Sequence, residues 1–147
     1  MKDKSQLLNY TIPQLLRWRV KETGAKVALR EKDFGYWNNY TWNDFYDYVR
    51  KIALGLEKVG VKRGDKLALI GDNIPEMLFM AIGAQSIGAV SAGIYQTTLP
   101  DEIAELINYL DVTAVFCDDQ EQVDKLVEIR DRIPQVRKVI YEDPRGM

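Results

Sequence analysis

Residues 95–98 (Tyr-Gln-Thr-Thr) are the segment of this sequence best suited to hold a ligand. They offer a phenol, an amide and two hydroxyls, contain no acidic residue, and stand between an apolar stretch and a helical pattern. The N-terminus of a helix carries partial positive charge and free N–H groups, which favour anionic and hydrogen-bonding ligands. We therefore expect any ligand contact to involve Tyr95, Gln96 and Thr97, although Thr98 is also suited to be a helix cap.

Two comparable segments are less suited to an anion. Residues 71–75 (Gly-Asp-Asn-Ile-Pro) place a carboxylate where a phosphate would lie, and proline removes one helix-start N–H. Residues 117–121 (Cys-Asp-Asp-Gln-Glu) are more acidic still, and their paired carboxylates could bind a hard cation. Because capping and solvation are commoner uses of such residues, we expect Asn73 and Asp119 to be helix caps and no metal to be bound.

Several common catalytic groups are missing. The sequence has no histidine and one cysteine, which argues against hydrolytic triads and zinc sites. Neither the G-x-G-x-x-G nor the G-x-x-x-x-G-K-[ST] phosphate-binding motif occurs. Cys117 ends an apolar stretch beside Asp118, which disfavours a thiolate, so we expect a buried apolar filler. We assign no catalytic residue.

The elements that position these segments follow an alternating pattern. Four apolar stretches alternate with three helical patterns: strands at 66–70, 90–95, 112–117 and 138–141, and helices at 75–87, 101–110 and 123–133. Strands that are apolar throughout are buried on both faces. The sequence therefore predicts an α/β fold, with a mostly parallel sheet, helices on both faces and an N-terminal antiparallel hairpin.

The N-terminal part divides into a helix within residues 1–26, capped by Thr11, and a hairpin within 27–42 that turns near Gly35. From Thr41, apolar residues recur every 3.6 positions until Gly60, which indicates a long helix leading into the β/α units of residues 43–147. Five aromatic residues are expected to pack in a core rather than to form a stacking platform: Trp18, Tyr36, Trp37, Tyr40 and Trp42.

Composition limits the class of protein. The chain has 147 residues, 46% hydrophobic and 29% charged, as expected of one globular domain, and its net charge of −2 argues against a nucleic-acid partner. The longest apolar run, 77–84, is too short to be a transmembrane segment. One cysteine and the lack of a secretory leader predict a cytoplasmic location.

Several segments, taken in order, resemble the beginning of the adenylate-forming, or AMP-binding, enzymes. They are residues 40–45 (YTWNDF), 60–65 (GVKRGD), 69–76 (LIGDNIPE) and 84–90 (AQSIGAV). Residues 93–100 (GIYQTTLP) and 143–146 (DPRG) most resemble the long-chain fatty acid–CoA ligases. The resemblance spans about residues 11–147 and implies that residues 1–147 are a single, truncated N-terminal subdomain of the acyl-CoA synthetase-like fold.

The resemblance implies a two-step ligase as the parent protein. ATP and a fatty acid give an acyl-adenylate with the help of Mg²⁺, and CoA then takes the acyl group. The family's phosphate loop, nucleotide contacts and catalytic lysine lie later in the chain, so we expect these residues alone to be inactive and to bind none of ATP, CoA or Mg²⁺ tightly. Related short-chain synthetases carry a glycine pair near the CoA path at the position of Gln96 and Thr97, which makes residues 95–97 the expected wall of that path.

The expected partners are the remainder of the parent polypeptide and the fatty acid, while a peripheral membrane contact and a homo-oligomer are left open. Two alternatives remain for the function. One is an adenylation domain for amino or aryl acids that passes its product to a carrier-protein thiol. The other is a non-catalytic α/β interaction module.

Overall fold

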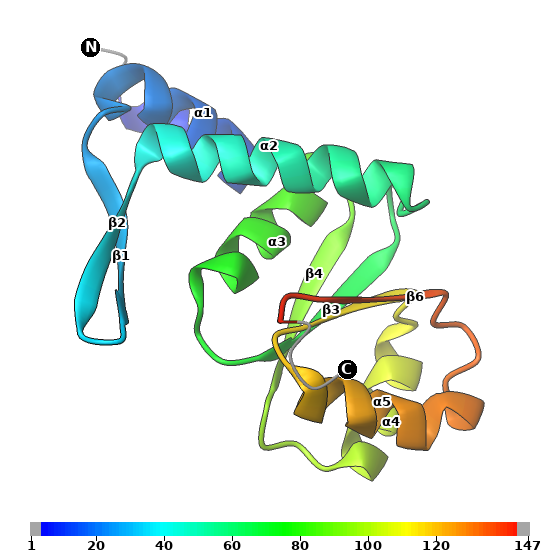
Figure 1. The fold of residues 1–147 in the computed structure, drawn as a ribbon. Coiled ribbons are helices and arrows are strands. Elements are labelled where there is room, and N and C mark those ends of the chain that lie inside the picture. Colours follow the sequence, from blue (N-terminus) through cyan, green and yellow to red (C-terminus); the bar gives the residue numbers. More distant parts are fainter. Residues whose placement is uncertain (1–3, 144–147) are drawn as a thin grey trace.

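The elements follow the alternation predicted from the sequence (Figure 1). The structure, a computed structural model, describes residues 4–143, so residues 144–146 of the DPRG segment lie outside the described part. The N-terminal elements are η1 (Lys4–Asn9), α1 (Ile12–Thr23), β1 (Val27–Asp33), β2 (Tyr36–Thr41) and α2 (Trp42–Lys58). The β/α units comprise β3 (Lys66–Gly71), α3 (Pro75–Ser86), β4 (Val90–Tyr95), α4 (Pro100–Leu110), β5 (Ala114–Cys117), α5 (Gln120–Ile129), η2 (Arg130–Arg132) and β6 (Lys138–Tyr141).

The main sheet has the strand order β4-β3-β5-β6, and each neighbouring pair is parallel. β1 and β2 form a separate antiparallel hairpin. Its turn places both Phe34 and Gly35 at positive φ, the conformation that matches the twist of a two-residue hairpin turn. The predicted α/β class, with its parallel sheet and N-terminal hairpin, is confirmed.

Helices cover both faces of the sheet. On one face, Ile70 and Val115 pack with Ile103 and Ile107 of α4 and with Leu126 of α5. On the other face, side chains of β3 and β5 pack with α2 and α3: Leu67, Leu69, Phe116, Leu56, Met80 and Ala84. Because consecutive residues of β3 and β5 point to opposite faces, both strands are apolar at nearly every position.

A third cluster joins the N-terminal elements to α3. Its centre is Phe79, which is fully buried and lies 5.0 Å from Phe45 and 4.8 Å from Tyr48 between ring centroids. Tyr40 of β2 contacts the same ring edge-on at 5.6 Å. Leu16 of α1 completes the buried set. One phenylalanine of α3 therefore links the hairpin and the first long helix to the sheet.

Local signals predict several helix ends correctly. Thr11 and Thr41 both form capping boxes, with Gln14 and Asp44 as the reciprocal partners, and Asp119 caps α5. Beyond α2, Gly60 has φ of +95° and its N–H donates to Glu57, while the N–H of Val61 donates to Leu56. This is the double hydrogen bond of a Schellman ending, and glycine adopts its left-handed backbone without strain.

Two predicted caps are wrong. α3 and α4 begin at Pro75 and Pro100, and their N-cap residues are Ile74 and Leu99, not Asn73 and Thr98. Proline is preorganised for the first helical position, where its missing N–H costs no hydrogen bond. It therefore fixes the cap as the residue directly before it.

Other predicted helix and strand boundaries also differ from the observed ones. α5 starts at Gln120, directly after its cap, and ends at Ile129, so the predicted helix 123–133 is wrong at both ends. Pro134 excludes the preceding Ile133 from helical geometry, and a 3₁₀ turn fills the gap. Strand β5 begins at Ala114 rather than at 112, because the N–H of Val112 donates to Ile107 in the ending of α4.

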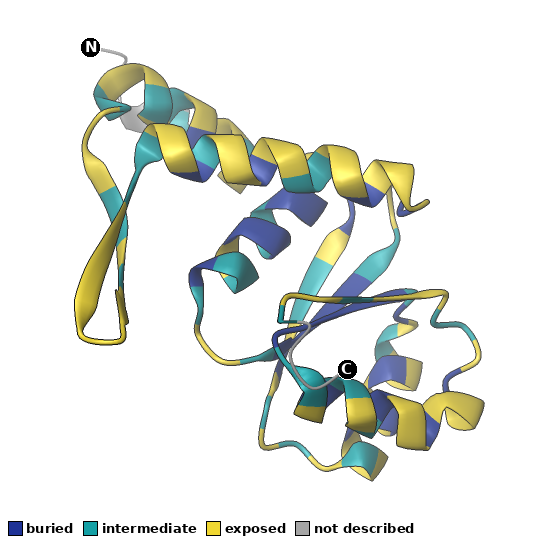
Figure 2. Cartoon of the chain, viewed as in Figure 1, coloured by how far each residue is buried: buried dark blue, intermediate teal, exposed yellow. Residues whose placement is uncertain are grey.

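The aromatic residues are only partly buried. Tyr40 packs in the core and Trp42 stacks on Phe45, whereas Tyr36 and Trp37 of the hairpin are exposed. Figure 2 shows the hairpin as mostly exposed along its length. The prediction of a shared aromatic core is therefore wrong for Tyr36 and Trp37, because their strand projects beyond the helices that cover its base.

Within residues 4–143, no helix is long and apolar enough to cross a membrane.

The capping box of α2 yields a prediction about acid. The Thr41 hydroxyl and N–H both donate to Asp44 Oδ2, at 2.6 and 2.8 Å, and these bonds hold the pKa of Asp44 below its usual value. The ionised Asp44 carboxylate therefore stabilises the fold at pH values above the ordinary carboxyl pKa. This stabilisation is lost as the pH falls through the lowered pKa. In Thr41→Val we expect an NMR titration to show the pKa of Asp44 rising towards its ordinary value. Thr11→Val, which breaks the uncharged box with Gln14, should leave it unchanged; equal values in wild type and Thr41→Val would contradict the assignment.

Candidate functional site

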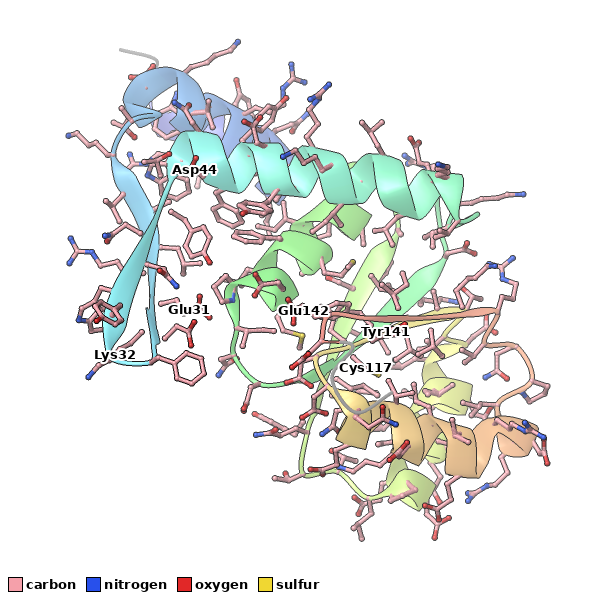
Figure 3. All side chains as sticks on the ribbon, in the orientation of Figure 1. Glu31, Lys32, Asp44, Cys117, Tyr141 and Glu142 are labelled. Carbon is pink, nitrogen blue, oxygen red and sulfur yellow. The ribbon has the colours of Figure 1, made fainter. Side chains whose placement is uncertain are left out.

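The loops that follow β3, β4 and β5 meet at one edge of the sheet. The register pairs Gly71 with Tyr95 and Ile70 with Cys117, so the carboxyl ends of the three strands are level. Tyr141 of β6 lies beside Cys117 at the same edge, as Figure 3 shows. In open parallel sheets, ligands bind beyond the carboxyl ends of the strands. This edge is the candidate site.

Gln96 connects the loops after β3 and β4 to helix α5. Its side-chain Nε2 donates to Asp72 Oδ1 in the loop after β3, at 2.5 Å. Its backbone carbonyl accepts a hydrogen bond from Lys125 Nζ of α5, also at 2.5 Å. Gln96 is half-buried, and its side chain and backbone are therefore both fixed by neighbours distant in the sequence.

Lys125 is the cation of this edge. Besides the Gln96 carbonyl, its Nζ donates to Gln122 Oε1 at 3.2 Å and forms an ion pair with Glu121 Oε1 at 3.0 Å. An ammonium group has three N–H donors, and these three acceptors use all of them. The group therefore holds the loop after β4 against α5 and has no donor left for a ligand.

Asp118 belongs to the same hydrogen-bond network as Gln96, because both residues bond to Asp72. Its carboxylate accepts from the Asp72 N–H at 2.7 Å and lies against Gly71, where an added Cβ would come within 2.3 Å of the Asp118 carboxyl carbon. Burial and then the charge of Asp119 raise the pKa of Asp118, although the Asp72 N–H acts in the opposite direction. Among the described residues, nothing donates to the second oxygen, Oδ1.

Tyr95 and Thr97 are placed differently from Gln96. The Tyr95 side chain is 85% exposed and Thr97 is also exposed, so both point away from the network. The N–H of Thr98 donates to the Tyr95 carbonyl at 3.0 Å, which forms a tight turn. The loop therefore offers an exposed phenol and hydroxyl on a turn that Gln96 anchors.

An open cleft lies beside this edge, between the hairpin and the loop after β3. It has a volume of about 540 Å³, and its lining includes Asp72 and Pro75 on one side and Glu31 and Trp37 on the other. In Figure 3, Glu31 of the hairpin and Glu142 after β6 lie on either side of the start of α3.

Carboxylates lie close to one another beside the cleft, whose lining also includes the cations Arg30 and Lys32. Burial, followed by the charges of Glu142 and Glu31, raises the pKa of Glu76 at the start of α3. Burial and the neighbouring Glu31, which accepts from the Tyr40 hydroxyl at 3.2 Å, raise the pKa of Tyr40 to about 12. A raised carboxyl pKa means that the ionised form is disfavoured there.

These residues do not fit a nucleotide triphosphate with its magnesium ion. The edge presents the carboxylates of Asp72, Asp118 and Asp119, and its lysine is already saturated. Like charges would repel the phosphates, and no glycine-rich loop supplies backbone donors. Within residues 4–143, no three of the cysteine, aspartate and glutamate side chains are grouped to hold a metal ion. The arrangement can anchor a loop and present it to a ligand held elsewhere.

Cys117 is fully buried at the end of β5, as predicted. Its burial, and secondarily the charges of Asp118 and Asp119, raise the pKa of its thiol to about 12. Only the thiolate reacts with disulfide reagents. At pH 8 we expect Cys117 to react with an aromatic disulfide about 100-fold or more slowly in the native chain than in urea. In a Cys117→Ser background, Ser86→Cys on the exposed end of α3 should react at the same rate in both conditions. A fast native reaction of Cys117 would show that the strand end is open.

The sequence indicated residues 95–98 as a candidate ligand loop but did not indicate that Asp72 and Lys125 support it. Lys125 carries one local signal, the acidic residue four positions earlier that can pair with it on a helix. No local signal indicates its bond to Gln96, which is 29 positions away.

Comparison with known proteins identifies the family. Residues 16–146 match the family described as AMP-binding enzyme. Over 138 residues, the chain is 30% identical to the long-chain-fatty-acid–CoA ligase ACSBG1 of Rattus norvegicus, which covers 93% of this chain and 19% of the relative. ACSBG2 of the same species is 30% identical over 131 residues, which cover 88% of this chain and 20% of the relative. The chain thus spans about a fifth of the length of these curated relatives.

Solved structures share the fold. An anthranilate CoA ligase, AuaEII, in complex with anthranoyl-AMP superposes with a TM-score of 0.83 at 20% identity, over 96% of this chain and 26% of that chain. The N-terminal domain of FACL13 from Mycobacterium tuberculosis gives 0.81 at 22% identity, over 88% of this chain and 33% of that one. Since the family match covers most of the residues and the curated relatives are fatty acid–CoA ligases, this chain belongs to the AMP-binding enzyme family.

Proposed function

We propose that the chain is the N-terminal subdomain of a long-chain fatty acid–CoA ligase. The parent would join ATP and a fatty acid into an acyl-adenylate with release of pyrophosphate, and the CoA thiol would then displace AMP. The observation that carries the proposal is the similarity to fatty acid–CoA ligases along 93% of the chain. ATP, Mg²⁺ and the catalytic groups would be held by the remainder of the polypeptide, because the carboxylates at the strand ends would repel a triphosphate.

Within that enzyme, residues 95–97 would form one wall of the CoA path. The anchoring of Gln96 to Asp72 and Lys125 supports this role, since it fixes a turn whose next side chain, Thr97, is exposed. Exposed hydroxyl and phenol groups on a rigid turn can donate to the phosphate or amide oxygens of a long cofactor. A lone, buried cysteine further favours the reducing cytoplasm as the place where this enzyme works.

Two measurements test the proposal. The purified 147-residue chain, mixed with ATP, Mg²⁺ and palmitate, should release no pyrophosphate above a blank, whereas the full-length parent should release it and form palmitoyl-CoA. Steady turnover by the short chain would refute its inactivity. If the parent releases pyrophosphate but does not convert palmitate, the proposed substrate class is wrong.

The CoA-path assignment is tested in the parent. Gln96→Ala should raise the KM for CoA while leaving the first step, measured by exchange of pyrophosphate into ATP, unchanged. The matched control is Gln135→Ala, near the opposite edge of the sheet, which should change neither. Equal KM values for CoA in Gln96→Ala and wild type would show that residues 95–97 do not line the CoA path.

A second candidate is adenylation of an amino or aryl acid. It is favoured by the folds of AuaEII, whose structure contains anthranoyl-AMP, and of VinN, solved with L-aspartate and similar to this chain with a TM-score of 0.77. Replacing palmitate by anthranilate or aspartate in the same pyrophosphate assay separates the two.

A further inference from the structure

An open pocket lies at the amino-terminal edge of the main sheet, where the strands begin. It has a volume of about 270 Å³ and is bordered by the end of α2 and the starts of β5 and β6. In Figure 1, the end of α2 and the start of β6 both lie at the right of the molecule. Because the strands are parallel, residues 95–97 lie at the opposite edge, about 20 Å away along a six-residue strand. We call it the amino-edge pocket and define it by six of its lining residues: Val59, Val61, Lys62, Ala114, Arg137 and Lys138.

The amino-edge pocket combines an apolar floor with a cationic rim. The floor consists of one half-exposed and two buried aliphatic side chains, which are Val59, Val61 and Ala114 respectively. The rim consists of three exposed cations, Lys62, Arg137 and Lys138. None of the described residues that line the pocket is acidic, whereas the cleft beside the candidate site includes two carboxylates. An organic group therefore fits the floor and an anionic group fits the rim.

Hydrogen bonds fix the backbone that carries these side chains. The N–H of Thr113 donates to the Lys66 carbonyl at 3.0 Å, and the N–H of Arg137 donates to the Thr113 carbonyl at 2.9 Å. The N–H of Lys62 donates to Asp65 Oδ2 at 2.8 Å. A ligand therefore has little backbone to order when it binds, which lowers the entropic cost of binding.

The cations of the rim outnumber the carboxylates that they meet. Asp65, whose side chain is 19% exposed, accepts from Arg137 Nη2 at 2.9 Å, so these two charges offset each other. Lys62 and Lys138 form no ion pair with any residue that the structure describes. Two positive charges are therefore uncompensated at this pocket, in a chain whose net charge is −2.

Two further carboxylates lie near this edge, and each has a cation beside it. Asp111 forms an ion pair with Lys66 Nζ at 3.1 Å. Glu57, near the end of α2, is exposed and is followed by Lys58, which is also exposed. Neither carboxylate is among the residues that line the pocket. They therefore do not cancel the charge of the rim.

We propose that the amino-edge pocket binds a small organic phosphate. A phosphomonoester carries close to two negative charges at pH 7.5, which balance Lys62 and Lys138, whereas a carboxylate would balance only one of them. The guanidinium of Arg137 has N–H donors beyond the one that it gives to Asp65, and guanidinium groups bind phosphate oxygens in pairs. The organic part of the ligand lies on the apolar floor. The inference does not depend on the proposed reaction, because it uses no residue of the candidate site.

The test uses the 147-residue chain and phenyl phosphate, which joins a dianionic phosphate to an apolar ring. At pH 7.5 and constant ionic strength, we expect calorimetry to show one bound phenyl phosphate per chain. NMR should show shifted amides at residues 59–62, 113–114 and 137–138. Benzoate has a similar ring with one charge and inorganic phosphate has no ring, so both should bind about 10-fold more weakly. Equal affinity for benzoate would refute the requirement for a dianion, and equal affinity for inorganic phosphate would overturn the organic class of ligand.

Two sets of variants separate the rim from the floor. Lys62→Gln with Lys138→Gln should weaken the binding of phenyl phosphate about 10-fold or more, because the two uncompensated charges are lost. Val59→Ser should weaken the binding of phenyl phosphate but leave the affinity for inorganic phosphate unchanged, since the valine contacts only the organic part.

Matched controls separate this pocket from the rest of the surface. Lys21→Gln with Lys26→Gln removes the same charge from exposed positions near the end of α1, and Val127→Ser removes an exposed valine from α5. Both controls should bind phenyl phosphate as wild type does, and circular dichroism should show every variant folded. The proposal is overturned by no binding of phenyl phosphate at millimolar concentration, by equal losses in test and control variants, or by amide shifts confined to other parts of the chain.

Discussion

Replacing Phe79 by alanine should lower the free energy of unfolding by about 3–5 kcal/mol, the usual cost of deleting a fully buried phenylalanine. Phe79 is 0% exposed and contacts the rings of Tyr40, Phe45 and Tyr48. The substitution leaves a cavity where three elements meet. Because Tyr40 and Leu29 of the hairpin pack on this cluster, we also expect the amides of β1 and β2 to exchange faster with solvent.

Urea denaturation followed by circular dichroism measures the first effect, and hydrogen exchange measures the second. Leu78→Ala is the matched control, since Leu78 is the preceding residue of the same helix and is 46% exposed. It should cost about 1 kcal/mol or less, as expected for a half-exposed side chain. If the two substitutions prove equally costly, the aromatic cluster is not the link between the hairpin and the sheet.

Gly71→Ala should destabilise the chain by about 2–4 kcal/mol, because it combines backbone strain with a steric clash. Gly71 has φ of +155°, and an alanine Cβ would meet the Asp118 carboxyl carbon at 2.3 Å. The carboxylate cannot move without losing its hydrogen bond from the Asp72 N–H. The substitution should therefore disturb both the fold and the loop that Gln96 anchors.

Gly93→Ala provides the control in the adjacent strand. A Cβ at Gly93 meets nothing within 4 Å, so we expect a change within about 1 kcal/mol of zero. In the full-length parent, Gly71→Ala should also raise the KM for CoA, if the wall of the CoA path depends on this loop. A stable Gly71→Ala chain would show that Asp118 relaxes without cost.

The two glycines show why a family resemblance alone does not define a site. The resembling segment 69–76 includes Gly71 and Asp72, and residues 93–100 include Gln96. Only the parallel register brings the two segments together, with Gly71 opposite Tyr95. The role of each residue then follows from its partner: Gly71 makes room for Asp118, and Asp72 holds Gln96.

The sequence by itself determined the class of fold and most of its local ends. Apolar strands separated by helical patterns required a sheet covered on both faces, and the Thr41 and Gly60 signals set both ends of α2, because capping and left-handed endings depend on residues only a few positions apart. The predictions of Asn73 and Thr98 as caps were wrong for an equally local reason, the preference of proline for the first helical position.

Tertiary structure alone decided which polar groups meet and which aromatic residues are buried. The contacts of Gln96 with Asp72 and Lys125 span 24 and 29 positions, and periodicity carries no information about such pairs. Likewise, Tyr40 is half-buried and packs on the core whereas Tyr36 is exposed on the same strand, because only the base of the hairpin lies under α2 and α3. A residue's own pattern predicts its element and its face, but its partners are set by how the layers pack around the whole core.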